Sequence, residues 1–128
     1  SVAVNLLGEN ATVLGGVGDD TITITSASRG YLAGDDGSDR LSIGSGAATT
    51  SVLGGAGNDL ISIAGGLTAD SLFGADGNDS FVLNGVISST LVDVGTGVDS
   101  VLLGTGADSI TLTGALTCLL YTSDEYHC

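Results

Sequence analysis

The sequence predicts an all-β protein, a right-handed parallel β-roll or β-solenoid of about five to six coils. Three observations support this fold class. A Gly- and Asp-rich motif recurs every 19 or 20 residues, apolar residues recur with the same period, and the composition combines 22 Gly with no Pro, Met or Trp. Self-similarity at a fixed period is typical of repeat proteins, in which each repeat is one unit stacked on its neighbours.

The motif occurs five times. Its copies are GGVGDD, GDDGSD, GGAGND, GADGND and VGTGVD, and they begin at residues 15, 34, 54, 74 and 94. Their last residues are spaced 19, 20, 20 and 20 apart: Asp20, Asp39, Asp59, Asp79 and Asp99. Five copies at nearly constant spacing identify the repeat unit.

Apolar residues define two strands in each repeat. The second and fourth residues after each motif are apolar and alternate with polar ones, which predicts a short strand with one buried face. These residues are Ile22, Leu41, Ile61, Phe81 and Val101, and Ile24, Ile43, Ile63, Leu83 and Leu103. A strand is also predicted before each motif, at Val13, Leu32, Val52, Leu72 and Val92. Each repeat is then one coil, and coils stack about 4.8 Å apart. The intervening Thr21, Thr23, Thr25, Ser42 and Ser62 are expected to face outward.

The repeats are predicted over residues 1–114. Val2 and Val4 match Ile22 and Ile24, so we expect the chain to begin within a coil, as a fragment of a longer array. Residues 115–128 form a tail without the repeat. The segment CLLYTSD, which begins at Cys118, matches the in-frame translation of a common transposase sequencing adapter, which predicts that the tail is a sequencing artefact. The alternative is a short capping strand with a disulfide.

Charge and composition exclude several classes of function. Fifteen acidic residues against two basic ones give a net charge of −13, so we expect neither nucleic acid nor an anionic membrane surface as a partner. No apolar run reaches the roughly 18 residues of a membrane span, so no membrane insertion is expected. The single His, His127, lies in the tail, and no catalytic set can be assembled around it. We therefore predict no enzymatic activity and no catalytic residues.

The motif Asp residues predict a cation site. Coils in register place these five carboxylates above one another, and two carboxylates about 4.8 Å apart repel by roughly 3–4 kcal/mol at an effective dielectric of about 20. Such a column opposes folding unless a cation lies between successive coils. The motifs offer only oxygen ligands, including the amides of Asn58 and Asn78, and contain no His or Cys. This set argues against zinc, copper and iron and favours Ca²⁺.

The motifs resemble the Gly-Gly-x-Gly-x-Asp-x-apolar-x repeat of the RTX (haemolysin-type) calcium-binding family, in a variant with coils of 19–20 residues. GGVGDDTIT and GGAGNDLIS carry the resemblance, and GDDGSDRLS and GADGNDSFV are looser matches. The resemblance implies that Asp carboxylates and Gly carbonyls hold Ca²⁺ between coils. The implied carboxylates are the five motif Asp residues, and the implied carbonyls are those of Gly16, Gly18, Gly37, Gly55, Gly57, Gly77 and Gly97. Five turns leave four gaps for ions.

The second turn of each repeat departs from the family pattern. Its segments GSGAATT, AGGLTAD and NGVISST lack the motif, so we expect calcium on one edge only. Asp70 and Asp108 are the candidate ligands on the second edge, and each is either a weak ligand or a turn cap. The other Asp residues of the repeats are expected to face solvent: Asp19, Asp35, Asp36, Asp76 and Asp93. The variable turn positions carry no Thr or Asn array, so ice binding is not expected.

The resemblance implies a calcium-binding β-roll module of a secreted or cell-surface protein, located outside the cell, that folds on binding Ca²⁺. Two alternatives stay open. One is a structural spacer, adhesin or surface-layer segment, and the other is the C-terminal secretion module of an extracellular hydrolase. Besides calcium ions, the expected partners are a surface polysaccharide or neighbouring solenoid domains.

Overall fold

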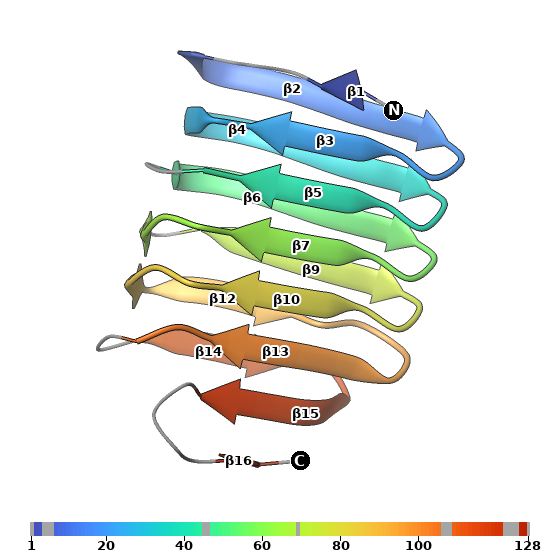
Figure 1. The fold of residues 1–128 in the computed structure, drawn as a ribbon, viewed down its shortest axis with the longest axis vertical. Helices are drawn as coiled ribbons and strands as arrows, with labels where there is room; N and C mark the ends of the chain where they lie inside the picture. The colour runs from blue at the N-terminus through green and yellow to red at the C-terminus, as the bar shows by residue number, and fades with distance from the viewer. Residues whose placement is uncertain are drawn as a thin grey trace.

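In the computed structural model, two parallel β-sheets wind into a solenoid of about five coils (Figure 1). The structure describes residues 2–3, 7–44, 47–68, 70–105, 109–121 and 126–127. Strands of the front sheet run from right to left and those of the back sheet from left to right as the chain descends, so the winding is right-handed. The predicted fold class is confirmed. The described residues include no helix, and therefore none that could cross a membrane.

The front sheet has eight strands, stacked in chain order along the solenoid axis. All pairs are parallel except the last, which is antiparallel. The strands are β1 (Val2–Ala3), β3 (Thr21–Ile24), β5 (Arg40–Ile43), β7 (Leu60–Ile63), β10 (Ser80–Leu83), β13 (Asp99–Leu103), β15 (Leu116–Tyr121) and β16 (Tyr126–His127).

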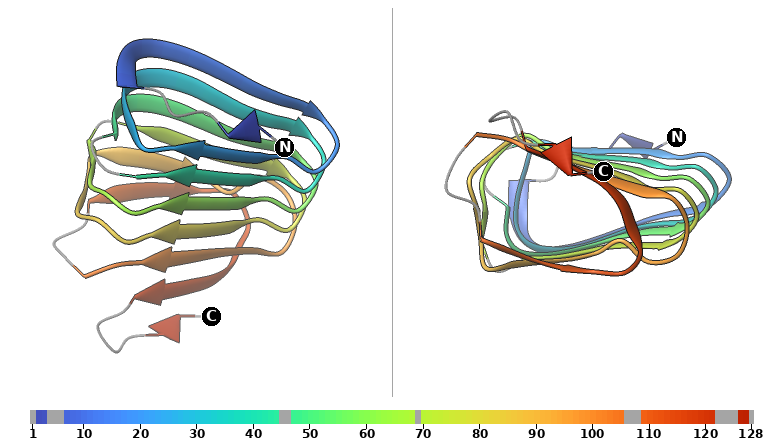
Figure 2. Two further views of the ribbon diagram at one scale, coloured as in Figure 1. Left: turned by 45° about the horizontal axis from the view of Figure 1, so that its top comes forward. Right: turned by 90° about the horizontal axis from the view of Figure 1, so that it is seen from below.

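The back sheet contains longer strands, because in the first coils it turns a corner and continues along a short third side. Asn10 and Arg29 stand at this corner with left-handed φ of 64° and 58°. In later coils the third side is a separate short strand, and Figure 2 shows the resulting closed outline. The strands are β2 (Leu7–Val17), β4 (Ser26–Asp36), β6 (Ala47–Ala56), β9 (Ser71–Asp76), β12 (Thr90–Asp93) and β14 (Ile110–Thr113), with β8 (Leu67–Thr68) and β11 (Ile87–Ser88) on the third side.

The core is a set of side-chain columns parallel to the axis. Ile22 lies in register with Leu41, and Leu41 with Ile61, and so on down the front sheet. Every apolar position predicted inside is buried: Val13, Leu32, Val52, Leu72, Val92, Ile22, Leu41, Ile61, Phe81, Val101, Ile24, Ile43, Ile63, Leu83 and Leu103. Burying one such aliphatic side chain contributes about 1.5–3 kcal/mol. The predicted outward Thr and Ser residues are exposed or half-buried.

The two ends of the repeat region differ in their register. At the N-terminal end Val2 pairs with Ile22, as predicted, while Val4 lies outside the described residues. At the C-terminal end β15 joins β13 with a bulge, since Asp99 faces Leu116 whereas Ser100 faces Cys118. The backbone of residues 116–121 thus adds a seventh strand to the front sheet. The adapter origin of the tail stays a prediction.

The second residue of every motif has a left-handed backbone. Gly16, Gly55 and Gly95 occupy this position in three coils, and Asp35 and Ala75 occupy it in the other two, with φ of 74° and 82°. An L-residue in this conformation is strained by about 1–2 kcal/mol. We predict that Ala75→Gly stabilises the protein by about 0.5–1 kcal/mol, because the relief of strain exceeds the added entropy of the unfolded chain.

Urea denaturation at a fixed calcium concentration measures this effect. The control is Ala56→Gly, one position further along the preceding motif, where φ is not positive. That variant is expected to destabilise the protein by about 0.5–1 kcal/mol. Shifts of the same sign in both variants would contradict the assignment of strain to Ala75.

Candidate metal centre

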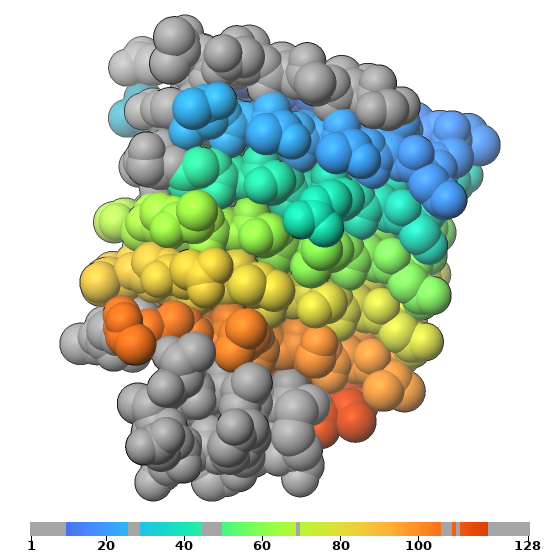
Figure 3. All heavy atoms as spheres, in the orientation of Figure 1, coloured from blue at the N-terminus to red at the C-terminus, as the bar shows by residue number. Residues whose placement is uncertain are grey.

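The five motifs stack along one edge of the solenoid, on the right in Figures 1 and 3. In the first four coils the back-sheet strand runs through the third motif residue, and the front-sheet strand begins directly after the motif Asp. In the fifth coil β12 already ends at Asp93, before the motif. Because the flanking strands are paired in register, the same motif position recurs in each layer.

The motif carboxylates form a hydrogen-bonded column inside this edge, defined here as the Asp column: Asp20, Asp39, Asp59, Asp79 and Asp99. Each is at most 8% exposed. From Asp39 onward, Oδ1 of each Asp accepts the backbone N–H of the Asp in the preceding coil, at 2.6 Å for Asp39 and at 2.8 or 2.9 Å for the three that follow. The predicted stacking of these carboxylates is present, and backbone amides reinforce it.

The second carboxylate oxygen is different. Oδ2 of Asp39, Asp59, Asp79 and Asp99 is buried and has no hydrogen-bond partner. A buried polar atom left unpaired costs about 1–3 kcal/mol, and more when it carries charge. Four such atoms along one column require either protons or a cation to balance them.

The first glycine of the motif lets these oxygens pack closely against the backbone. A Cβ at Gly34, Gly54 or Gly74 would come within 3.0 Å of Oδ2 of its own motif Asp and of the next coil's carbonyl oxygen. None of these three has a left-handed φ. The requirement for Gly is therefore steric at this position. In the fifth coil the position is taken by Val94, which is fully buried.

The glycine at the fourth motif position directs its carbonyl toward the next coil. The carbonyl oxygens of Gly18, Gly37, Gly57 and Gly77 each lie within 3.0 Å of the point where a Cβ would stand on the glycine at the same position of the next coil, which is Gly97 in the last case. The described backbone hydrogen bonds use none of these four oxygens. Gly16 and Gly55 differ, because they lie within β2 and β6 as part of the sheet. The set of predicted carbonyls thus divides into gap-facing and sheet positions.

Burial raises the pKa of three carboxyls in the column, Asp39, Asp59 and Asp79, the last to about 6. The amide that each of them accepts lowers the pKa, and neighbouring carboxylates of the column raise it. These three carboxyls therefore keep their protons to a higher pH than an exposed Asp does, in the absence of a cation.

A second ladder of hydrogen bonds runs along the fifth motif position, on the exposed side of the Asp column. The backbone N–H of Ser38 donates to Asp19 Oδ1 at 2.9 Å, and that of Asn58 donates to Ser38 Oγ at 3.3 Å. The N–H groups of Asn78 and Val98 donate to the Oδ1 of Asn58 and Asn78, both at 2.8 Å. The side-chain amides of Asn58 and Asn78 were candidate ligands in the sequence, and the oxygen of each accepts one backbone N–H in the structure.

Asp70 lies on the opposite edge and is 2% exposed. Its Oδ1 accepts the N–H of Thr50 and its Oδ2 accepts that of Thr68, the latter at 2.8 Å. Burial raises the pKa of this carboxyl, and the two amides lower it. Of the two roles left open by the sequence, this geometry corresponds to a turn cap. Asp108 lies outside the described residues.

The remaining acids vary in exposure. Asp19, Asp36 and Asp76 are exposed, as expected, whereas Asp35 and Asp93 are half-buried. Asp76 Oδ1 accepts the hydroxyl of Thr96 at 3.0 Å. These acids add negative charge to the outside of the motif edge.

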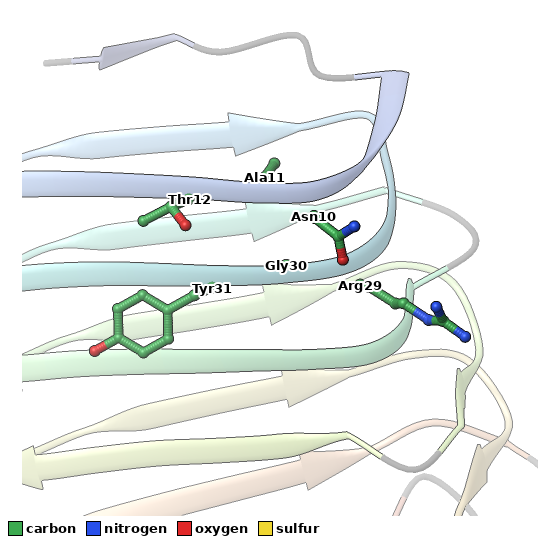
Figure 4. Close-up of a pocket in the computed structure, with 6 residues that line it drawn as sticks. All are labelled: Asn10, Ala11, Thr12, Arg29, Gly30 and Tyr31. Atoms are coloured by element: carbon green, nitrogen blue, oxygen red, sulfur yellow. The ribbon is translucent and has the colours of Figure 1, made fainter.

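A hollow of about 310 Å³ lies on the back sheet in the first two coils, away from the motif edge (Figure 4). It contains no carboxylate, which separates it from the candidate cation site. Its lining residues are Asn10, Ala11, Thr12, Arg29, Gly30 and Tyr31.

Within the described ranges, no group of three or more His, Cys, Asp or Glu side chains could hold one metal ion. An ion at the motif edge would therefore need backbone carbonyls besides the Asp side chains of two coils. No family model, curated protein or solved structure matches the chain.

Proposed function

We propose that this chain is a calcium-binding β-solenoid module of a secreted or cell-surface protein, and that Ca²⁺ binding completes its folding. The observation that supports this most directly is the set of buried Oδ2 atoms of Asp39, Asp59, Asp79 and Asp99, which have no hydrogen-bond partner. A cation there would pair with charges that otherwise oppose folding.

The donor set favours Ca²⁺ over other ions. Asp carboxylates of adjacent coils and the gap-facing carbonyls of Gly18, Gly37, Gly57 and Gly77 would hold it, and all of these ligands are oxygen. Ca²⁺ accepts six to eight oxygen ligands in flexible geometry, whereas Mg²⁺ keeps several of its waters. A buried column with little room for water therefore selects Ca²⁺.

Calcium concentration would then control folding. A ligand that binds only the folded chain stabilises it by RT ln(1 + [L]/Kd). In a calcium-poor compartment the Asp column destabilises the coils, and in millimolar external calcium the bound ions restore their stability. This dependence suits a protein that is exported before it folds.

A calcium titration followed by far-UV circular dichroism tests the proposal. We expect strand signal to rise with Ca²⁺ at pH 7.5, to return to baseline in excess chelator, and to respond much less to Mg²⁺. A chain fully folded in chelator, with no change in its melting temperature on adding calcium, would sink the proposal.

Asp59→Asn is expected to have opposite effects on the calcium-free and the calcium-bound protein. Without calcium we expect this variant to be more stable than the parent by about 1–3 kcal/mol, because it removes a buried charge from the middle of the column. With calcium we expect it to be less stable, because the ion loses a ligand. Thermal melts in chelator and in calcium measure both signs. Asp36→Asn, which removes an exposed charge, is the control and should change neither by more than about 0.5 kcal/mol.

A structural spacer is the second candidate function. It is favoured by the two ladders of side-chain hydrogen bonds, which join successive coils without any ion. In that case length and stiffness are the function, and a chelated chain stays folded with an unchanged dichroism spectrum.

A further inference from the structure

The acids of the motif edge are concentrated at its N-terminal end. Asp19 and Asp35 lie in the first two motifs, near Asp39. The third and fourth motifs carry no acid at either position: Asn58 and Asn78 replace Asp19, and Gly55 and Ala75 replace Asp35. The coils are therefore unequal in charge although their backbones repeat.

Asp39 is the member of the Asp column that feels this excess charge. Burial is the largest cause of its raised pKa, and the carboxylates of Asp20, Asp19 and Asp35 add to it. Asp59 feels one neighbouring carboxylate only, that of Asp39. The group around Asp39 thus holds four carboxylates, compared with two around Asp59 and three around Asp79.

Two structural details hold the additional acids in place. Asp19 is tied to the second coil, because its Oδ1 accepts the N–H of Ser38 at 2.9 Å. Asp35 is half-buried and occupies a left-handed position that glycine fills in three other coils.

The cluster surrounds an atom that lacks a partner. Asp39 is 3% exposed, and its Oδ2 accepts no hydrogen bond. This orphaned oxygen distinguishes the cluster from a solvated acidic surface, because a buried oxygen without a partner is where a cation would bind.

We propose that Asp19 and Asp35 make the calcium site at Asp39 the tightest of the column and the first to fill, so that folding starts in the first two coils and proceeds toward the C-terminus. This inference rests on the proposed calcium function. Each additional carboxylate within several ångströms of a divalent ion strengthens its attraction in a partly buried site. We expect about a tenfold gain in affinity for each of the two.

Calorimetric titration of the full chain with Ca²⁺ tests this order of binding. In the parent chain we expect one step tighter than the rest. Asp35→Asn should weaken that step about tenfold, leave the weaker steps unchanged, and lose its effect as salt increases. Asp76→Asn removes an exposed acid from the fourth motif and should leave the tightest step unchanged.

The converse variant places the charge elsewhere on an otherwise intact chain. Ala75→Asp puts an acid at the same left-handed position in the fourth coil, and we expect one of the weaker steps to tighten about tenfold. Ala75→Asn is the control for shape, because it has the same size without the charge. This pair decides the question even if Asp35→Asn fails to fold.

The possible results distinguish failure of the proposed calcium function from failure of the proposed order of binding. A parent chain that binds no calcium refutes the proposed function. A parent chain that binds calcium with equal steps overturns only the present inference. The same conclusion follows if Asp35→Asn weakens all steps alike or if Ala75→Asp tightens none.

Discussion

In excess chelator the chain is expected to be more stable at about pH 3.5 than at about pH 7.5, the reverse of most proteins. The raised pKa of Asp39, Asp59 and Asp79 is the reason. A group whose pKa is higher in the folded state stabilises that state below its unfolded pKa, and this stability is lost as pH rises through the folded value. The pKa of Asp79 rises from 3.8 to about 6, so the loss begins near pH 4 and extends past pH 6.

The expected size of this effect is large. A pKa difference of roughly two units corresponds to about 3 kcal/mol at neutral pH for Asp79 alone, with further contributions of the same sign from Asp39 and Asp59. The chain has only two basic residues, so few ion pairs are available to be lost in acid. Saturating calcium should reverse the trend, because protons then compete with the ion for the same oxygens.

Thermal melts across the pH range, with chelator and with saturating calcium, measure both slopes. Asp79→Asn is the matched variant, since its side chain does not titrate, and its pH dependence in chelator should be shallower than that of the parent. A chelated chain that gains stability as pH rises from 4 to 7 would contradict the burial of ionisable carboxyls in this column.

Replacement of Gly54 by alanine is expected to destabilise the protein by about 3 kcal/mol or more and to abolish the calcium response of the neighbouring coils. The added Cβ would come within 3.0 Å of Asp59 Oδ2 and of the Gly74 carbonyl oxygen. Backbone atoms of a stacked coil cannot move aside cheaply, and overpacking of this kind costs 1–3 kcal/mol or more. The methyl group would also displace the Asp59 carboxylate from its position.

Gly16→Ala provides the contrast. Gly16 has φ of 95° and no atom within 4 Å of its Cβ direction, so only backbone strain of about 1–2 kcal/mol is expected there. Chemical denaturation with and without calcium compares the two variants. Equal losses of stability, together with equal calcium responses, would show that the close approach at Gly54 is not what the position requires.

Periodicity in the sequence predicts the coil, its buried columns and the alignment of the Asp column. These features depend on which residues share a position, and a repeat states that directly. The short third side was not predicted, because its residues show neither a constant motif nor a regular alternation. The corner at Asn10 and Arg29 depends on a left-handed backbone conformation, and neither residue type indicates that conformation in the sequence.

The exposed ladder at the fifth motif position was missed for a different reason. Asp19, Ser38, Asn58 and Asn78 share a short side chain with an acceptor oxygen, and this was the available signal. What the sequence does not show is which backbone amides lack a partner in the sheet. Those N–H groups, seen in the structure, explain the choice of side chain.

The stacking of coils through bonds parallel to the solenoid axis has a mechanical consequence. A force that pulls the two ends of the chain apart can peel the coils from the end of the stack one at a time, since each coil is bonded only to its neighbours. The chain should therefore yield in successive steps, each releasing one coil of 20 residues, or about 70 Å of contour length. A calcium ion bound between two coils would raise the force needed to separate them. The force at each step would therefore report whether that interface holds an ion.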